Sequence, residues 1–94
     1  MRLRWTRRAL ADLGRIADRI AADKPAAATE FVKVVAEKVA RLQEFPLLGR
    51  AGAYQDTREL VVHKNYLVTY RVRGEDIDVL QVWHLARHLP RGPL

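Results

Sequence analysis

The chain has 94 residues, a formal net charge of +6 at pH 7 and no cysteine. This length accommodates one domain with one core, and the lack of cysteine excludes a disulfide framework, thiolate catalysis and a cysteine metal site. The sequence pI near 10.3 favours an anionic partner: nucleic acid, a nucleoprotein particle or an acidic protein. No apolar run approaches the roughly 20 residues that cross a bilayer, and no secretory signal is visible, so we expect a soluble, cytoplasmic protein without a membrane partner.

A short strand and an amphipathic helix are predicted first. Leu3 and Trp5 alternate with arginines, which is typical of a strand, and Thr6 can cap the helix that follows. From Ala9 onward the apolar positions keep the three-and-four spacing of one helical face, namely Leu10, Leu13, Ile16, Ala17, Ile20 and Ala21. The opposite, solvated face is predicted to carry Arg8, Asp12, Arg15 and Arg19.

A second helix is predicted to begin at Pro25, because proline is tolerated in the first turn and Asp23 can cap it. Its inner stripe consists of Ala28, Phe31, Val35, Val39 and Leu42, and its outer face carries Lys33, Glu37 and Arg41. The helix is expected to end before Pro46. The short connection between the two helices predicts an antiparallel hairpin.

Residues 46 to 56 are predicted to form a loop that packs Leu47, Leu48 and Tyr54 against the core. Three strands in a meander follow it, Thr57 to His63, Tyr66 to Arg73 and Ile77 to His84. Tight turns at residues 64–65 and 74–76 make neighbouring strands antiparallel. The predicted fold class is therefore α+β, with an N-terminal antiparallel helical hairpin packed on a small, mostly antiparallel sheet in the order β-α-α-β-β-β.

Alternation along the middle strand separates two faces. The better core face holds Tyr66, Val68, Tyr70 and Val72. Arg71 and Arg73 lie on the other face, where they are predicted to form a cationic patch with Arg58. The last strand does not show a clean alternation, because Val79 and Leu80 are both apolar.

The chain resembles the RelE/ParE superfamily, the toxins of type II toxin–antitoxin pairs, over nearly its whole length. The segments that carry the resemblance, in this order and spacing, are residues 3–6 (LRWT), 9–13 (ALADL), 45–50 (FPLLGR), 57–62 (TRELVV), 66–72 (YLVTYRV) and 82–87 (VWHLAR). The resemblance implies a helical hairpin on a mostly antiparallel sheet.

The resemblance also implies one of two targets. RelE-like members are ribosome-dependent mRNA endonucleases, whereas ParE-like members poison DNA gyrase without nuclease chemistry. Arg58 falls on a position that is basic in the nucleases, but Leu60 and Leu67 fall where they carry a lysine and an arginine. Arg87 falls near a second catalytic arginine, and residues 90–94 offer no tyrosine to match the one that follows it. Because removing a preorganised charge stabiliser costs about two to three orders of magnitude in rate, these losses favour the ParE-like branch.

The favoured hypothesis is a gyrase inhibitor that acts by binding, needs no cofactor or metal, and is neutralised by an acidic, partly disordered antitoxin of the ParD-like or RelB-like kind. The predicted target-binding residues are Arg58, Arg71, Arg73, Trp83, His84, Arg87 and His88, with Arg91 beside them. The predicted antitoxin-binding residues are Leu13, Ile16, Ile20 and Arg71. The histidines at 63, 84 and 88 lack the spacing of a metal site.

Two other hypotheses stay open. A RelE-like nuclease acting on ribosome-bound mRNA would use Arg58, His84 and Arg87, and Glu59 is either its base or an ion-pair partner of a neighbouring arginine. A degenerate toxin would keep only antitoxin binding or DNA corepression. Trp83 fits either a binding anchor or a core residue.

Overall fold

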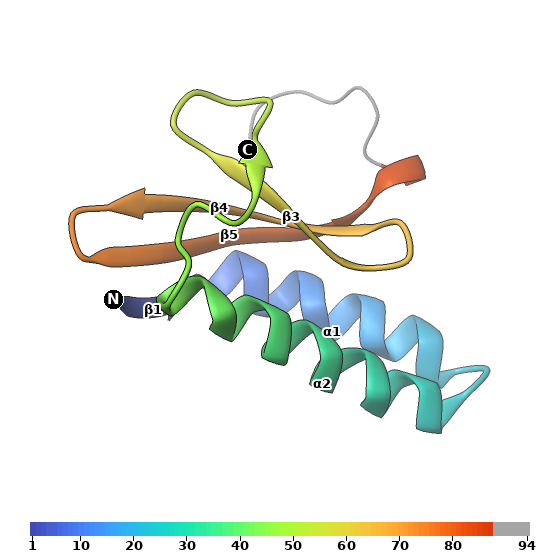
Figure 1. Cartoon of the computed structure of the whole chain (residues 1–94). Helices are drawn as coiled ribbons and strands as arrows, with labels where there is room; N and C mark the ends of the chain where they lie inside the picture. The colour runs from blue at the N-terminus through green and yellow to red at the C-terminus, as the bar shows by residue number, and fades with distance from the viewer. Residues whose placement is uncertain (88–94) are drawn as a thin grey trace.

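The computed structural model describes residues 1–87, in which two helices lie along one face of a five-stranded sheet (Figure 1). The elements are β1 (Arg2–Trp5), α1 (Arg7–Ala21), α2 (Pro25–Ala40), the 3-10 turn η1 (Arg41–Gln43), β2 (Arg50–Ala51), β3 (Arg58–His63), β4 (Tyr66–Arg73), β5 (Asp76–His84) and the 3-10 turn η2 (Leu85–Arg87). The strand order is β1-β5-β4-β3-β2, parallel between β1 and β5 and antiparallel elsewhere. The predicted fold class and element order are confirmed, with β2 as an additional short strand.

Thr6 joins the start of α1 to the middle of β5. Its side-chain oxygen accepts the N–H of Ala9 at 3.1 Å, which is the predicted N-cap, and its hydroxyl donates to the carbonyl of Val79 at 2.8 Å. Its backbone N–H donates to the same carbonyl at 3.1 Å. The capping residue therefore fixes the place where the chain leaves the sheet and α1 begins.

The buried face of α1 differs from the predicted one. Leu10 is 53% exposed, whereas Asp12 is only 5% exposed. The helix turns Ala9, Asp12 and Ile16 toward the sheet, and residues at this spacing lie on one side of a helix. Leu10, one position beyond Ala9, is rotated by about 100° toward solvent. The assignment of Asp12 to the solvated face was therefore wrong.

Helix α2 supplies the larger part of the helical core, and its predicted stripe is confirmed, although its last member, Leu42, lies in the turn η1 that follows α2. All of its members are buried: Ala28, Phe31, Val35, Val39 and Leu42. Of these, Phe31, Val35, Val39 and Leu42 pack in one cluster with strand residues that include Leu60, Val62 and Val68. At about 25 cal/mol per Å² of apolar surface removed from water, burial of these side chains stabilises the domain.

A β-bulge in β5 explains why its alternation could not be determined from the sequence. The register with β4 changes between two successive pairs, Thr69↔Gln81 and Tyr70↔Val79, so that Leu80 is an extra residue. Val79 and Val82 consequently both belong to the buried core although they are three positions apart. Gln81 and Trp83 pair with β4 residues on the opposite face.

The loop after α2 is held by Tyr70 rather than by its own leucines. The Tyr70 hydroxyl donates to the carbonyl of Pro46 at 2.8 Å and accepts the N–H of Gly49 at 2.9 Å. Leu47 and Leu48 are 64% and 45% exposed, so the prediction that they pack on the core was wrong. A Cβ at Gly49 would lie 2.8 Å from the Tyr70 ring, which is why this close approach needs glycine.

Candidate functional site

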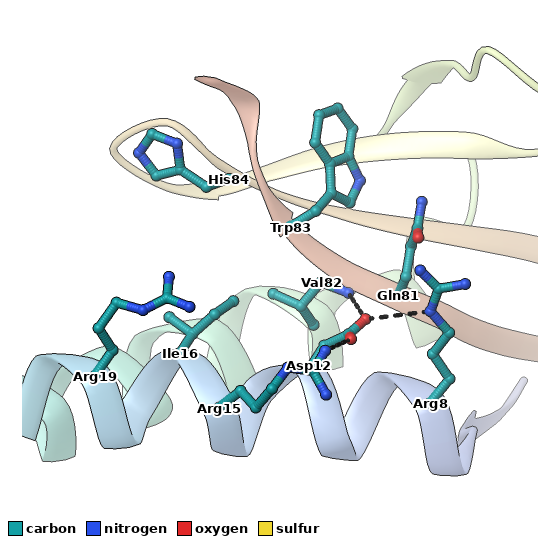
Figure 2. A pocket seen from close by; sticks show the side chains of 9 residues that line it. All are labelled: Arg8, Asp12, Arg15, Ile16, Arg19, Gln81, Val82, Trp83 and His84. Atoms are coloured by element: carbon teal, nitrogen blue, oxygen red, sulfur yellow. Dashed lines mark hydrogen bonds and ion pairs between the residues drawn. The ribbon is translucent and has the colours of Figure 1, made fainter. Parts of the chain in front are cut away.

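A groove runs between α1 and the C-terminal half of β5. Strand β1 pairs with β5 only as far as Val79, and beyond that point α1 flanks the strand. The groove has a volume of about 170 Å³ and is lined by Arg8, Asp12, Arg15, Ile16, Arg19, Gln81, Val82, Trp83 and His84 (Figure 2). We call it the α1–β5 groove.

Asp12 lies at the centre of the α1–β5 groove and joins its two walls. Its carboxylate accepts the backbone N–H of Val82 at 3.0 Å, which satisfies a donor on the otherwise unpaired edge of β5. Arg8 approaches the same carboxylate at 3.7 Å and Arg15 forms an ion pair with it (Figure 2). A buried carboxylate with these partners attaches α1 to the edge of β5 and orients both arginines.

The electrostatic character of the α1–β5 groove is positive. Arg8, Arg15 and Arg19 line the groove together with one carboxylate, that of Asp12, so its positive charges exceed its negative charge by two. Among residues 1–87, Arg19 has no ion-pair partner. The Arg8 and Arg15 side chains are 51% and 65% exposed, so their guanidinium groups stay accessible. The planar guanidinium group of arginine presents several N–H donors whose geometry matches carboxylates and phosphates.

His84 and Trp83 form the strand wall of this groove. The His84 Nδ1 accepts the N–H of Ala86 at 3.1 Å, and its ring meets the Tyr66 ring edge-on at 4.8 Å. The Trp83 indole N–H donates to the Thr69 hydroxyl at 2.9 Å. Both predicted target-binding residues are thus fixed in position, but the Trp83 indole points away from α1 (Figure 2).

The remaining predicted residues at this end of the chain are less fully described. The backbone of Arg87 belongs to η2. His88 and Arg91 lie outside the described residues.

Arg58, Arg71 and Arg73 line a second depression, of about 620 Å³, at the other end of the sheet. Arg58 is opposite Tyr70 and therefore lies on the face of the sheet opposite to Arg71 and Arg73. It donates to the carbonyl of Gly49 at 2.7 Å, and Arg73 donates to Asp78 at 2.8 Å. The three predicted cations share a depression, but two of them are already engaged in holding the fold.

The residues predicted to bind antitoxin lie mostly inward. Ile16 is only 7% exposed, and Leu13 and Ile20 pack against the same core. The apolar surface of these side chains is largely used by the fold. Their contact with an antitoxin remains a prediction, as does that of Arg71.

No group of three or more His, Cys, Asp or Glu side chains that could hold a metal occurs among residues 1–87. No helix within those residues is long and apolar enough to cross a membrane.

Glu59 pairs with Arg50 at 3.3 Å and also accepts the N–H of Ala53 at 3.2 Å. Its carboxylate is therefore occupied by structural contacts, and its partner is Arg50 rather than the adjacent Arg58.

Sequence reasoning missed the arginine stripe of α1 as a site. The signal was present, because Asp12 has an arginine four positions before it and another three positions after it, and all three then share a face. What the sequence did not indicate is that Asp12, between these arginines, is buried against the edge of β5.

The sequence-family model of the ParE toxin of the type II toxin–antitoxin system parDE matches residues 3–89. The chain belongs to this ParE toxin family. Toxin RelE2 of Caulobacter vibrioides is 37% identical over 88% of the chain and 93% of its own length. The protein Y4kP of Sinorhizobium fredii is 38% identical over 96% of the chain and 94% of its own length.

Solved structures agree with this assignment. A chain of the chromosomal ParDE system of P. aeruginosa has a TM-score of 0.84 and 30% identity, covering 90% of this chain and 96% of that chain. A toxin of Helicobacter pylori, 14% identical with a TM-score of 0.67, covers 95% of this chain and 99% of its own and shares the fold. The ParE-family chain is thus a type II toxin of the RelE/ParE superfamily, and its partner is a cognate antitoxin.

Proposed function

We propose that this chain inhibits DNA gyrase by binding it, without covalent chemistry, and that the α1–β5 groove carries the contact. The observation that supports binding over RNA cleavage is the separation of the nuclease candidates. Arg58 pairs with Tyr70 and His84 pairs with Tyr66, four residues away along β4. At about 3.3 Å per residue this places them roughly 13 Å apart along the sheet. General acid–base catalysis needs both groups within hydrogen-bond reach of one phosphate.

The two leucines at nuclease positions support the same proposal. Leu60 is 9% exposed and Leu67 is 2% exposed, so both are packing residues rather than remnants of a catalytic surface. Arg58 is the basic residue of that set, and a guanidinium N–H of Arg58 donates a hydrogen bond to the loop carbonyl of Gly49. A pentavalent phosphate would find no cluster of preorganised cations at these positions.

The alternative function is ribosome-dependent mRNA cleavage, and one observation favours it. Toxin RelE2 of Caulobacter vibrioides, a relative at 37% identity, carries the RelE name. This alternative would use Arg58, His84 and Arg87, and it requires that they act without a cation at position 60 or 67.

The deciding experiment adds the purified chain to two parallel assays, gyrase supercoiling and mRNA cleavage in a reconstituted translation system. We expect supercoiling to be lost while the message stays intact. Cleavage of the mRNA together with normal gyrase supercoiling would instead establish ribonuclease activity. Normal results in both assays would point to the degenerate toxin.

A matched pair of variants tests the groove itself. Arg19→Gln removes a groove cation that has no ion-pair partner among residues 1–87, and we expect it to raise the concentration for half-inhibition of gyrase roughly tenfold. Arg7→Gln is the control, because Arg7 is exposed on the same helix but does not line the groove. Equal effects of the two variants would exclude the groove as the gyrase contact.

A further inference from the structure

Strand β3 presents an open edge on the side away from β4. The two residues of β2 pair with Arg58 and Glu59 only. Beyond Glu59, no strand among residues 1–87 pairs with this side of β3 as far as His63. An uncovered strand edge offers unpaired amide and carbonyl groups to another chain.

The backbone of Val61 faces this open side. On the β2 side, the carbonyl of Thr57 accepts the N–H of Gly52 at 2.8 Å. Because backbone groups alternate along an antiparallel strand, Glu59 and Val61 also turn theirs to that side. The Val61 side chain is itself 52% exposed. The edge is thus available for hydrogen bonding at the same place where an apolar side chain is uncovered.

A groove of about 370 Å³ runs beside this edge, and four of its lining residues carry the argument: Lys38, Arg41, Leu48 and Val61. Leu48 and Val61 give this groove an apolar surface, while Lys38 and Arg41 lie on its side next to the C-terminal end of α2. The carboxylate of Glu59, which also lines it, is taken by Arg50 and by the N–H of Ala53. Within residues 1–87, Lys38 and Arg41 therefore have no carboxylate partner.

We propose that the outer edge of β3 binds an extended, acidic segment of the cognate antitoxin as an added antiparallel strand. Main-chain bonds to the open edge would supply affinity, an apolar side chain of the segment would fill the groove between Leu48 and Val61, and a carboxylate would reach Lys38 or Arg41. The proposal rests on the toxin having an antitoxin, and not on gyrase being its target.

A second copy of this chain fits the same edge poorly. Pairing two β3 edges would bring two sets of Lys38 and Arg41 together between molecules that each carry a net charge of +6. Like charges facing each other across an interface are costly. An acidic segment instead supplies the missing carboxylates.

The β3 edge and the α1–β5 groove lie on opposite sides of β4. Loss of antitoxin binding at the β3 edge should therefore leave toxicity intact. The toxin would escape neutralisation, which is a different phenotype from inactivation.

The test uses the full-length toxin and its cognate antitoxin, defined as the protein that restores growth on coexpression. The double variant Lys38→Gln with Arg41→Gln should weaken the measured Kd about tenfold at low salt, and less at high salt. The control, Lys24→Gln with Lys33→Gln, makes the same charge change at exposed positions outside the groove. Both double variants should arrest growth like the wild type.

Val61→Pro tests the strand pairing, since proline is accepted on an edge whose N–H faces outward. We expect it to weaken antitoxin binding about tenfold or more through loss of ladder bonds. Should this variant not fold, hydrogen exchange in the wild-type complex decides: the Val61 amide should exchange about tenfold more slowly, or slower still, than in free toxin. Unchanged Kd in the charge variant, or protection confined to the α1–β5 groove, would overturn the proposal.

Discussion

A single carboxylate, that of Asp12, joins the helical layer to the sheet. It satisfies the Val82 N–H and binds two arginines while only 5% exposed. We expect Asp12→Ala to lower the free energy of unfolding by about 2 kcal/mol, because the Val82 donor is left buried without an acceptor. Asp12→Asn keeps an acceptor oxygen and should cost less. Urea denaturation of the variants measures the difference.

Asp18 provides the control for this prediction. It lies on the same helix but is exposed, so Asp18→Ala should change the stability by less than about 0.5 kcal/mol. Similar losses in both alanine variants would mean that Asp12 acts only as a general helical charge, and not through the edge of β5.

Tyr70 attaches the loop between α2 and β2 to the sheet. Its buried hydroxyl bridges Pro46 and Gly49. Tyr70→Phe should lower the free energy of unfolding by about 1 to 2 kcal/mol, because both loop groups lose a partner. Faster amide exchange at Gly49 in the variant would locate the effect in the loop, and unchanged exchange there would contradict it.

The same residue predicts an alkaline limit of stability. Burial raises the pKa of the Tyr70 hydroxyl, and this outweighs the opposing effects of the Gly49 N–H and the Arg58 charge. A group whose pKa is raised by folding stabilises the native state fully below its unfolded pKa, about 10 for tyrosine, and loses this contribution as the pH rises further. The wild type should therefore lose more stability above pH 10 than Tyr70→Phe, as measured by denaturation across that range.

The elements differ in how far the sequence could predict them. The apolar stripe of α2 keeps one helical spacing without interruption, so this spacing alone identified every buried member. In β5, by contrast, the extra residue Leu80 reverses the alternation, and no local signal specified where. Strand β2 has only two residues and exists because Glu59 and Arg58 offer partners, which is a tertiary cause. The loop leucines at 47 and 48 look like core in sequence but lie outside because Tyr70 holds the loop.

The strand order places two positively charged surfaces on opposite sides of β4. The α1–β5 groove lies on one side of β4 and the β3 edge on the other. A net charge of +6 makes both surfaces attractive to acidic partners at long range. The net charge could be determined from the sequence, but the separation of the positive residues into the α1–β5 groove and the β3 edge depends on the strand order. With that order, the proposed target contact and the proposed antitoxin contact would not overlap.

This arrangement links antitoxin binding to the stability of the whole domain. A 94-residue chain has a small core, so a partner that binds only the folded state should raise its unfolding free energy measurably. With antitoxin at 100 times Kd the gain is about 2.7 kcal/mol, and a variant with tenfold weaker affinity at the same concentration gains about 1.4 kcal/mol. Thermal unfolding followed through the fluorescence of Trp5 and Trp83, with antitoxin alone as the reference, should show a midpoint that rises less for Lys38→Gln with Arg41→Gln than for the wild type. Equal rises would mean that the antitoxin stabilises the fold without using the edge of β3.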